Sequence, residues 1–346
     1  MNSPSIDRDF DVRASNQIKG IAIVLMLVHH YFGFPQWTSS VFNTQIIEYG
    51  VNINYYIAAT SKMCVSLFAF VTGWAYSKSS HRDLKYSVHK AVSMLEKYWA
   101  ILFFVCIPVA ALCGEKKIDA KGLLNSLFAT SDENICFFAW YIHFYVLAIL
   151  TLPLIYYASK NSTRIKIIIL GILLIISSVN HIVGVSGIIE EYFYWMPLIL
   201  VGDICGKSEN YATLYKWLCS QSTFFKVMAL LSLMLCKAVR AGVSGVNLDI
   251  IYVPLIILII ISLLNSKKVP FLEFMGHYSM LIWFLHGFFY SPYTKEKFQR
   301  VLFISQNLWV SFFWFLALSI GMAVAYDRIG KVVSTFFRKF SLQSLE

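Results

Sequence analysis

Long apolar segments, each close to the length needed to cross a bilayer, recur along the whole chain. Stretches of about 17 to 25 mostly apolar residues are typical of membrane-spanning helices. Ten such segments can be delimited, at 18–34, 58–77, 94–113, 137–157, 165–180, 188–206, 224–240, 250–265, 274–291 and 302–325. The pattern predicts an all-α fold, a polytopic membrane helix bundle with about ten transmembrane helices.

The composition argues against a soluble protein. The chain is 58% hydrophobic and 14% charged, whereas soluble domains contain about 25% charged residues. The net charge of +10 comes from Lys and Arg spread beside the apolar segments. This distribution favours the lipid bilayer as partner over nucleic acid. The seven cysteines are odd in number and form no CxxC pair, so neither a disulfide framework nor a metal site is predicted.

The distribution of basic residues predicts the topology. With the N-terminus in the cytoplasm, 20 of the 29 Lys and Arg residues fall on the cytoplasmic side, which leaves 29 − 20 = 9 outside. This excess follows the positive-inside rule. The even number of segments returns the C-terminus to the cytoplasm. We expect residues 1–346 to form one integral-membrane domain with cytoplasmic segments at 1–17 and 326–346. Lys295, Lys297 and Arg300 run against the trend, because they fall outside.

The first apolar segment carries polar residues at both ends. It reads KGIAIVLMLVHH over 19–30, so Lys19 and His30 are 11 residues apart. On a helix they lie within about 20° of each other and about 16 Å apart along the axis. Polar side chains inside a span normally face the bundle interior or a wet cavity. The alternative is that His29 and His30 are packing or interfacial residues with satisfied hydrogen bonds.

The stretch NQIKGIAIVLMLVHHY at 16–31 resembles the first helix of the membrane acyltransferase-3 family, which carries Arg-Gly and a histidine 11 residues after the arginine. Gly20 and His30 fall on the family positions. Lys19 replaces the arginine, which keeps the charge but loses the bidentate fork. Similar segments follow in order: SLFAFVTGWAYSK at 66–78, RDLKYSVHKAVSMLEKYW at 82–99, FAWYIHFYVLAILTLP at 138–153, LILVGDICGK at 198–207 and FMGHYSMLIWFLHGFF at 274–289. The resemblance covers nearly the whole chain.

The resemblance implies an enzyme and its substrates. The family moves acyl groups, usually acetyl from cytoplasmic acetyl-CoA, onto hydroxyls of sugars and related acceptors. It therefore implies an O-acyltransferase, in the first instance an O-acetyltransferase, in the plasma (inner) membrane. Acetyl-CoA is the expected acyl donor, with no metal. The expected acceptor is a surface or exported polysaccharide or its lipid-linked precursor.

The resemblance also assigns catalytic roles to residues. His30 is the candidate general base, or alternatively a transient acyl carrier. Ser279, Trp283 and His286 lie at i, i+4 and i+7, so they share one helix face. His286 is expected to orient the acceptor or stabilise the oxyanion, with Ser279 as a hydrogen-bonding neighbour. His143 falls at a similar depth to the other two histidines.

Basic residues on the cytoplasmic side are the candidates for binding the phosphates of CoA. Lys19, Arg82 and Lys90 are assigned to this role, although the positive-inside rule alone also explains them. Asp203 is expected to pair with Lys207, one turn later in the sequence, or alternatively to lie near the CoA entrance.

Carboxylates on the outer side are candidates for contacting a glycan. They are Glu48, Glu190 and Glu191, and the alternative is that they are solvated charges in loops or at helix ends.

Two other classes of protein fit the same residues. A transporter or flippase of a lipid-linked sugar would also have ten helices and buried polar groups, but transporters often show inverted repeats and no repeat is evident here. A sensor or scaffold that retains the fold without catalysis is the third reading. Acyl transfer by the purified protein separates the enzyme from both.

Overall fold

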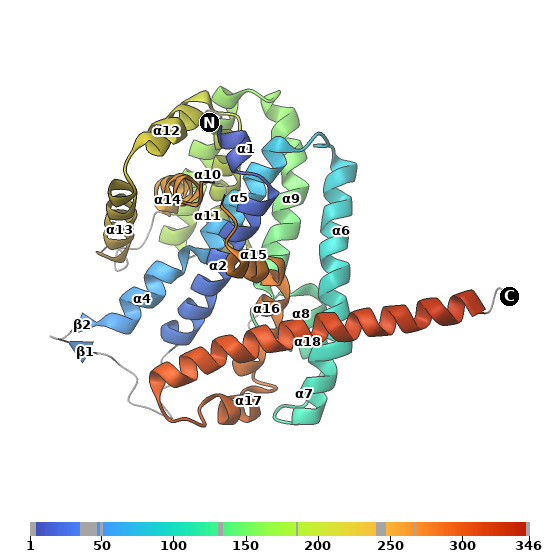
Figure 1. The fold of residues 1–346 in the computed structure, drawn as a ribbon. Helices are drawn as coiled ribbons and strands as arrows, with labels where there is room; N and C mark the ends of the chain where they lie inside the picture. Colours follow the sequence, from blue (N-terminus) through green and yellow to red (C-terminus); the bar gives the residue numbers. More distant parts are fainter. Residues whose placement is uncertain are drawn as a thin grey trace.

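The computed structural model describes residues 5–34, 47–48, 51–130, 134–184, 186–239, 247–265 and 267–343. Over these ranges the chain is an all-helical bundle (Figure 1), apart from one antiparallel pair of two-residue strands, β1 (Ile47–Glu48) and β2 (Val51–Asn52). The predicted polytopic helical bundle is confirmed.

Helices coincide in order with all ten predicted segments. They are α2 (Val12–Gly33); α4 (Ile53–Ser61) with α5 (Met63–Lys78); α6 (Leu84–Ile101) continued by the π-helix η1 (Leu102–Cys106) and α7 (Ile107–Cys113); α9 (Trp140–Ser159); α10 (Thr163–Val183); α11 (Ile188–Cys205); α13 (Thr223–Val239); α14 (Asp249–Leu264); α15 (Pro270–His277) with α16 (Ser279–Leu285) and the 3₁₀ turn η3 (His286–Phe289); and α18 (Leu308–Gln343). Short helices lie between or before them: α1 (Ile6–Asp9), α8 (Ala120–Phe128), α12 (Glu209–Ser220) and α17 (Lys295–Leu302).

Five helical stretches of the described chain are long and apolar enough to cross a membrane: Ile53–Lys78, Leu84–Cys113, Trp140–Ser159, Thr163–Val183 and Leu308–Val332. Two shorter apolar stretches are Asp249–Leu264 and Ser279–Phe289. The outer face of α10 exposes large aliphatic side chains, among them Ile167, Ile168, Ile172, Ile175 and Val179. Aliphatic side chains of this kind can lie against lipid tails. The helix also satisfies its own backbone hydrogen bonds, as the bilayer core requires.

The interior is built by helices that approach closely at glycines. A Cβ placed on Gly73 of α5 would lie 1.8 Å from the carbonyl oxygen of Ile199 on α11, and one on Gly202 would lie 2.2 Å from that of Phe70. Only glycine permits this separation of the two backbones. The contact fixes α5 beside α11, and these two helices carry much of the lining of the cavity described below.

A second close contact explains Gly20. A Cβ on Gly20 of α2 would lie 2.1 Å from the carbonyl oxygen of Leu272 on α15, and one on Gly276 would lie 1.9 Å from that of Asn16. This packing places the start of the ninth predicted segment against the helix that carries Lys19 and His30.

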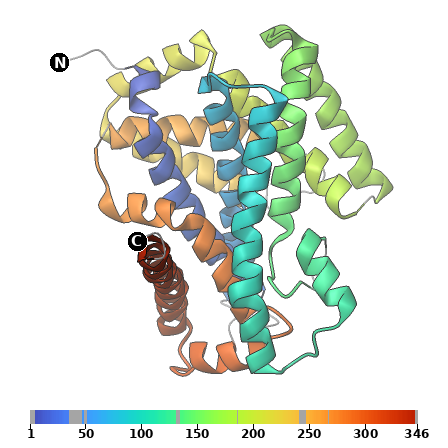
Figure 2. The same cartoon turned by 90° about the vertical axis from the view of Figure 1, so that its right-hand side faces the viewer.

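Two predicted segments differ in detail from the structure. The ninth is broken, because α15 ends at His277 and α16 begins at Ser279, with Tyr278 between them. The Tyr278 hydroxyl donates to Asp327 of α18 at 3.0 Å. The tenth begins at Leu308, since residues 295–302 form the separate helix α17. Helix α18 runs across the bundle at a steep angle to α6 (Figures 1 and 2).

The bundle has two distinct ends. The N-terminus, α1 and α12 lie at one end, here called the N-terminal end, and α7 and α17 lie at the other, here called the far end (Figure 1). Because α2 begins at the N-terminal end, its last residues, including His30, lie toward the far end.

Candidate active site

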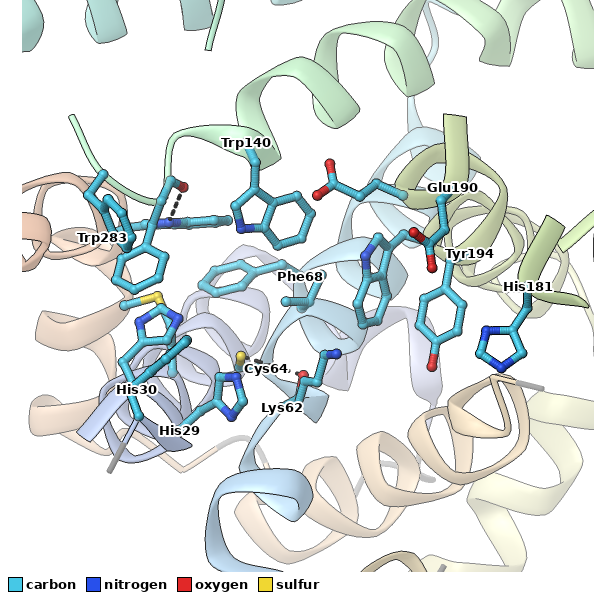
Figure 3. A pocket seen from close by; sticks show the side chains of 17 residues that line it. His29, His30, Lys62, Cys64, Phe68, Trp140, His181, Glu190, Tyr194 and Trp283 are labelled. Carbon is cyan, nitrogen blue, oxygen red and sulfur yellow. Dashed lines mark hydrogen bonds between the residues drawn. The ribbon is translucent and has the colours of Figure 1, made fainter. Parts of the chain in front are cut away.

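A cavity of about 700 Å³ lies toward the far end of the bundle (Figure 3). Aromatic rings and a small number of ionisable groups line it, as is common for small-molecule sites. Its lining comes from α2, the start of α5, the segment around the start of α9, the end of α10, the start of α11, and α16. The main residues are His29, His30, Lys62, Phe68, Phe138, Trp140, His181, Glu190, Glu191, Tyr194, Trp195 and Trp283.

Two histidines from distant parts of the chain are in contact at this cavity. His30 Nδ1 lies 2.8 Å from His286 Nε2, and the two rings are nearly parallel at 6°. His30 lines the cavity and is 8% exposed, whereas His286 is 0% exposed and lies behind it. The structure therefore brings together the two predicted histidines, one at the cavity surface and one in the interior.

A backbone carbonyl determines which nitrogen carries each proton. His286 Nδ1 lies 3.1 Å from the carbonyl oxygen of Ile282. A carbonyl only accepts, so Nδ1 of His286 donates and its Nε2 is left as the acceptor. The proton between the rings then belongs to His30 Nδ1. With both rings neutral, His30 Nε2 is unprotonated and available as a base.

Phe138 holds the plane of His30. The two rings are stacked with centroids 3.9 Å apart and an interplanar angle of 4°. Phe138 has a backbone φ of 66°, a left-handed conformation that costs about 1–2 kcal/mol for a residue with a Cβ. Its carbonyl oxygen accepts from Trp283 Nε1 at 3.2 Å. Trp283 thus fixes the strained backbone that places the Phe138 ring on His30.

A second, smaller cavity of about 240 Å³, here called the inner cavity, is lined by Lys19 and Ser279. Phe68 and Trp283 line both cavities, and their ring centroids are 5.7 Å apart. Ser279 donates its hydroxyl to the carbonyl of Gly276 at 2.8 Å. The structure therefore places Ser279 with Lys19 in the inner cavity and not beside the histidine pair.

The other two predicted cation sites lie in different surroundings. Lys90 is exposed on α6, with Nζ 5.3 Å from the centroid of the Tyr86 ring, and it is a charged neighbour of Lys19. Arg82 precedes α6 and donates from Nε to the carbonyl of Ser79 at 3.1 Å. Its guanidinium also lies 5.5 Å from the ring of Tyr156. Lys19 and Lys90 are thus neighbours, whereas Arg82 belongs to another group.

Two expectations about partners differ from the structure. His143 is not among the residues that line either cavity. Asp203 forms a buried ion pair with Lys166 of α10, not the expected one with Lys207. Lys207 instead donates to Asn161 Oδ1 at 2.6 Å. A lysine on a packed neighbouring helix reaches the buried carboxylate, whereas Lys207 lies in the turn beyond the end of α11.

Several cavity residues carried no clear signal in the sequence. His29 donates from Nδ1 to the carbonyl of Ala58 at 2.7 Å, and it lines the cavity beside His30. Trp140 begins α9 and Phe138 lies two residues before it, in the segment 138–153 that resembles the family, but neither was predicted to lie at the cavity. Glu190 and Glu191 line the cavity, and the side chain of Glu48 lies outside the described residues.

Comparison with known proteins gives one match. A family described as an acyltransferase domain matches residues 12–328 of the chain. No curated protein and no solved structure matches. In the described part of the chain, no group of three or more His, Cys, Asp or Glu residues is placed to hold a metal ion.

Proposed function

The chain belongs to the acyltransferase-3 family, whose domain spans residues 12–328, and on this premise we propose that it moves an acetyl group from cytoplasmic acetyl-CoA to a sugar hydroxyl. The acceptor is a surface or exported polysaccharide or its lipid-linked precursor, and the protein acts in the plasma (inner) membrane.

The observation that carries this proposal is the contact between His30 and His286. The hydrogen-bonded order, from the Ile282 carbonyl through His286 to His30, leaves His30 Nε2 as the proton acceptor. The base is therefore oriented by a second group, as in other acyl-transfer sites. The pair lies at a cavity large enough for a small substrate.

The chemistry follows from these protonation states. The acceptor hydroxyl loses its proton to His30 Nε2 as its oxygen attacks the thioester carbonyl carbon. The imidazolium that forms on His30 donates through Nδ1 to His286, which stabilises the charge. Collapse of the tetrahedral intermediate breaks the C–S bond, and the proton returns from His30 to the departing thiolate. In the alternative, His30 Nε2 attacks the thioester first and carries the acyl group. The same nitrogen serves both routes.

The two cavities supply a route for the donor. Lys19 lies in the inner cavity, and His30 lines the larger cavity of about 700 Å³, here called the outer cavity. The two residues are about 16 Å apart along α2. In the proposed path the phosphate groups of the donor stay near Lys19, and the thioester reaches His30 when the Phe68 and Trp283 rings, whose centroids are 5.7 Å apart, move aside. Along this path the acyl group reaches the far end of the bundle, while the nucleotide of the donor stays near Lys19.

The outer cavity suits a sugar as acceptor. Trp140 and Trp195 line it with centroids 6.5 Å apart and an interplanar angle of 29°. Aromatic faces of this kind pack against the apolar faces of sugar rings. Glu190 and Glu191 provide carboxylates that accept hydrogen bonds from hydroxyls.

The test compares surface polysaccharide from a deletion strain complemented with wild type, His30→Ala or His143→Ala. Proton NMR reports the O-acetyl groups, and immunoblots of membranes check equal protein levels. We expect acetyl signals to return with wild type and His143→Ala, and to stay absent with His30→Ala. The His143 variant is the matched control, because it loses a histidine that does not line the cavity.

Equal restoration by His30→Ala would remove His30 from the mechanism. No acetyl difference between the deletion strain and wild type would contradict a polysaccharide acceptor. Incubation of purified protein with radiolabelled acetyl-CoA and glycan then decides between an enzyme with another acceptor and a transporter.

A further inference from the structure

Three cations surround one aromatic ring at the N-terminal end of the bundle. Tyr156 lies in the last turn of α9. Arg82 Cζ, Lys166 Nζ and Lys207 Nζ lie 5.5, 5.9 and 5.8 Å from the centroid of its ring. They come from the α5–α6 connection, from α10 and from the turn after α11. We call these four residues the Tyr156 cation cluster.

The cluster holds more positive charge than its described partners neutralise. Lys166 has the carboxylate of Asp203 as an ion-pair partner, and both side chains are almost fully buried. Lys166 and Lys207 also donate hydrogen bonds to one neutral group. Asn161 Oδ1 accepts from Lys166 at 3.2 Å and from Lys207 at 2.6 Å. Arg82 donates to backbone carbonyls. One buried carboxylate, that of Asp203, thus faces three cations, while the Asp83 carboxylate next to Arg82 accepts from the backbone N–H of Tyr86.

The excess of positive charge affects the pKa of Lys207. Burial, together with repulsion from Arg82, Lys166 and Lys78, lowers the pKa of Lys207 to about 8, although Asp203 acts in the opposite direction. Lys78 is itself paired with Asp7 of α1 at 2.6 Å. A bound anion would relieve the repulsion among these ammonium groups and would hold Lys207 in its charged form.

A hollow of about 550 Å³ opens beside the cluster. Arg82 and Tyr156 line it together with Ser80 and His81, which can donate hydrogen bonds to an oxyanion. The carboxylate of Asp83 also lines it, whereas Lys166 and Lys207 lie at the Tyr156 ring outside the lining. We propose that the Tyr156 cation cluster and this hollow bind a phosphate group of a ligand that enters at the N-terminal end. The ligand is a nucleotide or an anionic phospholipid, because both present the same phosphate chemistry.

The Tyr156 cation cluster is separate from the outer cavity. Along α5, the 13 residues from Val65 at the outer cavity to Lys78 near the cluster span about 20 Å. A donor with its phosphates at the cluster would have to extend over that distance to reach His30. The nucleotide source rests on the proposed function, whereas the phospholipid source does not.

The test measures binding in nanodiscs without acyl transfer. The first arm titrates adenosine 3′,5′-bisphosphate into protein in phosphatidylcholine nanodiscs. The second compares thermal stability in phosphatidylcholine nanodiscs with and without phosphatidylglycerol. The variants are wild type, Lys207→Gln and Lys216→Gln. Lys216 is the matched control, because it is an exposed lysine of α12 at the same end.

We expect Lys207→Gln to weaken either the nucleotide affinity or the stabilisation by phosphatidylglycerol about fivefold to tenfold. Lys216→Gln should leave both quantities unchanged. Loss of nucleotide affinity identifies the nucleotide as ligand, and loss of the phosphatidylglycerol effect identifies the lipid. Equal behaviour of the two variants in both arms, or no effect of either probe on wild type, overturns the site. Binding of either probe by a protein that transfers no acetyl group would contradict the proposed function but not the phosphate site.

A pH series gives an independent readout. Lys207 is charged below its pKa of about 8 and loses its charge above it, so affinity for the phosphate probe should fall as the pH rises through 8. Lys207→Arg keeps its charge throughout this range and should keep its affinity. A wild-type profile that follows that of Lys207→Arg would exclude Lys207 from binding.

Discussion

Single residues determine the protonation of the histidine pair. The Ile282 carbonyl obliges His286 to donate, and His286 in turn obliges His30 to donate toward it. His30 needs this support, because a buried donor left without an acceptor costs about 1–3 kcal/mol. The proposal therefore makes His286 a positioning residue for His30, since His286 contacts His30 but does not line the cavity.

Replacing His286 by Phe tests this role. The phenyl ring preserves volume and can still stack, but it removes the acceptor for His30 Nδ1. We expect kcat to fall about 10²-fold with little change in the KM of donor or acceptor. The double variant with His30→Ala should be no slower than His30→Ala alone, as measured by steady-state kinetics in nanodiscs. Additive losses would show that the two histidines act independently.

Lys19 is the second residue for which a substitution is decisive. It lies in the inner cavity, where a cation would meet the donor before the thioester reaches His30. Lys19→Ala should raise the KM for acetyl-CoA about tenfold at nearly constant kcat, because a charge-assisted contact is worth about 1.5–3 kcal/mol. Lys19→Arg should retain or lower the KM. An unchanged KM in Lys19→Ala would remove it from donor binding.

Among the helices, the contact between α5 and α11 sets the geometry of the site. Both helices contribute residues to the wall of the outer cavity, and their separation depends on glycines that face the partner backbone. A change in this separation would displace Phe68 of α5 relative to Trp195 of α11. Helix packing far from the histidines therefore controls the shape of the acceptor cavity.

Gly202→Ala is the substitution that tests this contact. Its Cβ would meet the Phe70 carbonyl at 2.2 Å, so the helices must separate at a cost of about 1–3 kcal/mol. We expect a lower melting temperature in detergent. Gly171→Ala on α10 is the control, because nothing lies within 4 Å of its added Cβ, and alanine favours the helix there. Equal melting temperatures for the two variants would contradict the close packing.

The three basic residues that run against the predicted topology belong to one short helix, α17. Lys295, Lys297 and Arg300 lie on this short helix at the far end. Its first turn is held by Glu115, whose carboxylate accepts from the backbone of Glu296 at 2.9 Å and of Lys297 at 2.8 Å. An acidic residue at a helix N-terminus is favourable, so these charges accompany a structured connection between α16 and α18.

At the scale of the whole molecule, the inner and outer cavities share the rings of Phe68 and Trp283 in their linings. In the proposed path, an acyl group that moves from Lys19 to His30 passes these rings. The inner cavity holds about 240 Å³ and the outer about 700 Å³. The passage, more than either cavity, is therefore expected to select the length of the acyl group.

Phe68→Ala should widen the passage. We expect kcat/KM for butyryl-CoA relative to acetyl-CoA to rise about fivefold or more, because a steric barrier to the longer chain is removed. Phe68→Leu is the conservative control and should shift the ratio less. The measurement is transfer from the two donors under identical conditions, and an unchanged ratio in Phe68→Ala would refute a selective passage.

The sequence predicted where helices form better than it predicted which residues of different helices contact one another. The apolar runs located helices at all ten segments, although five stretches of the described chain are long and apolar enough to cross a membrane. The break at Tyr278 was missed, since the apolar run continues through it. His30 and His286 were both singled out, and His143 was only placed at a similar depth, because depth in the membrane does not reveal which helices touch. Asp203 was matched with Lys207 for the same reason, although a lysine 37 residues away is its partner.

The backbone of Phe138 places stability and catalysis in opposition. Its left-handed conformation would be relaxed by glycine or asparagine, yet neither residue supplies a ring to stack on His30. Selection for thermal robustness alone would drive position 138 toward glycine. Selection for turnover would retain an aromatic residue there. The residue found at this position in a set of relatives would thus record which of the two pressures has governed each lineage.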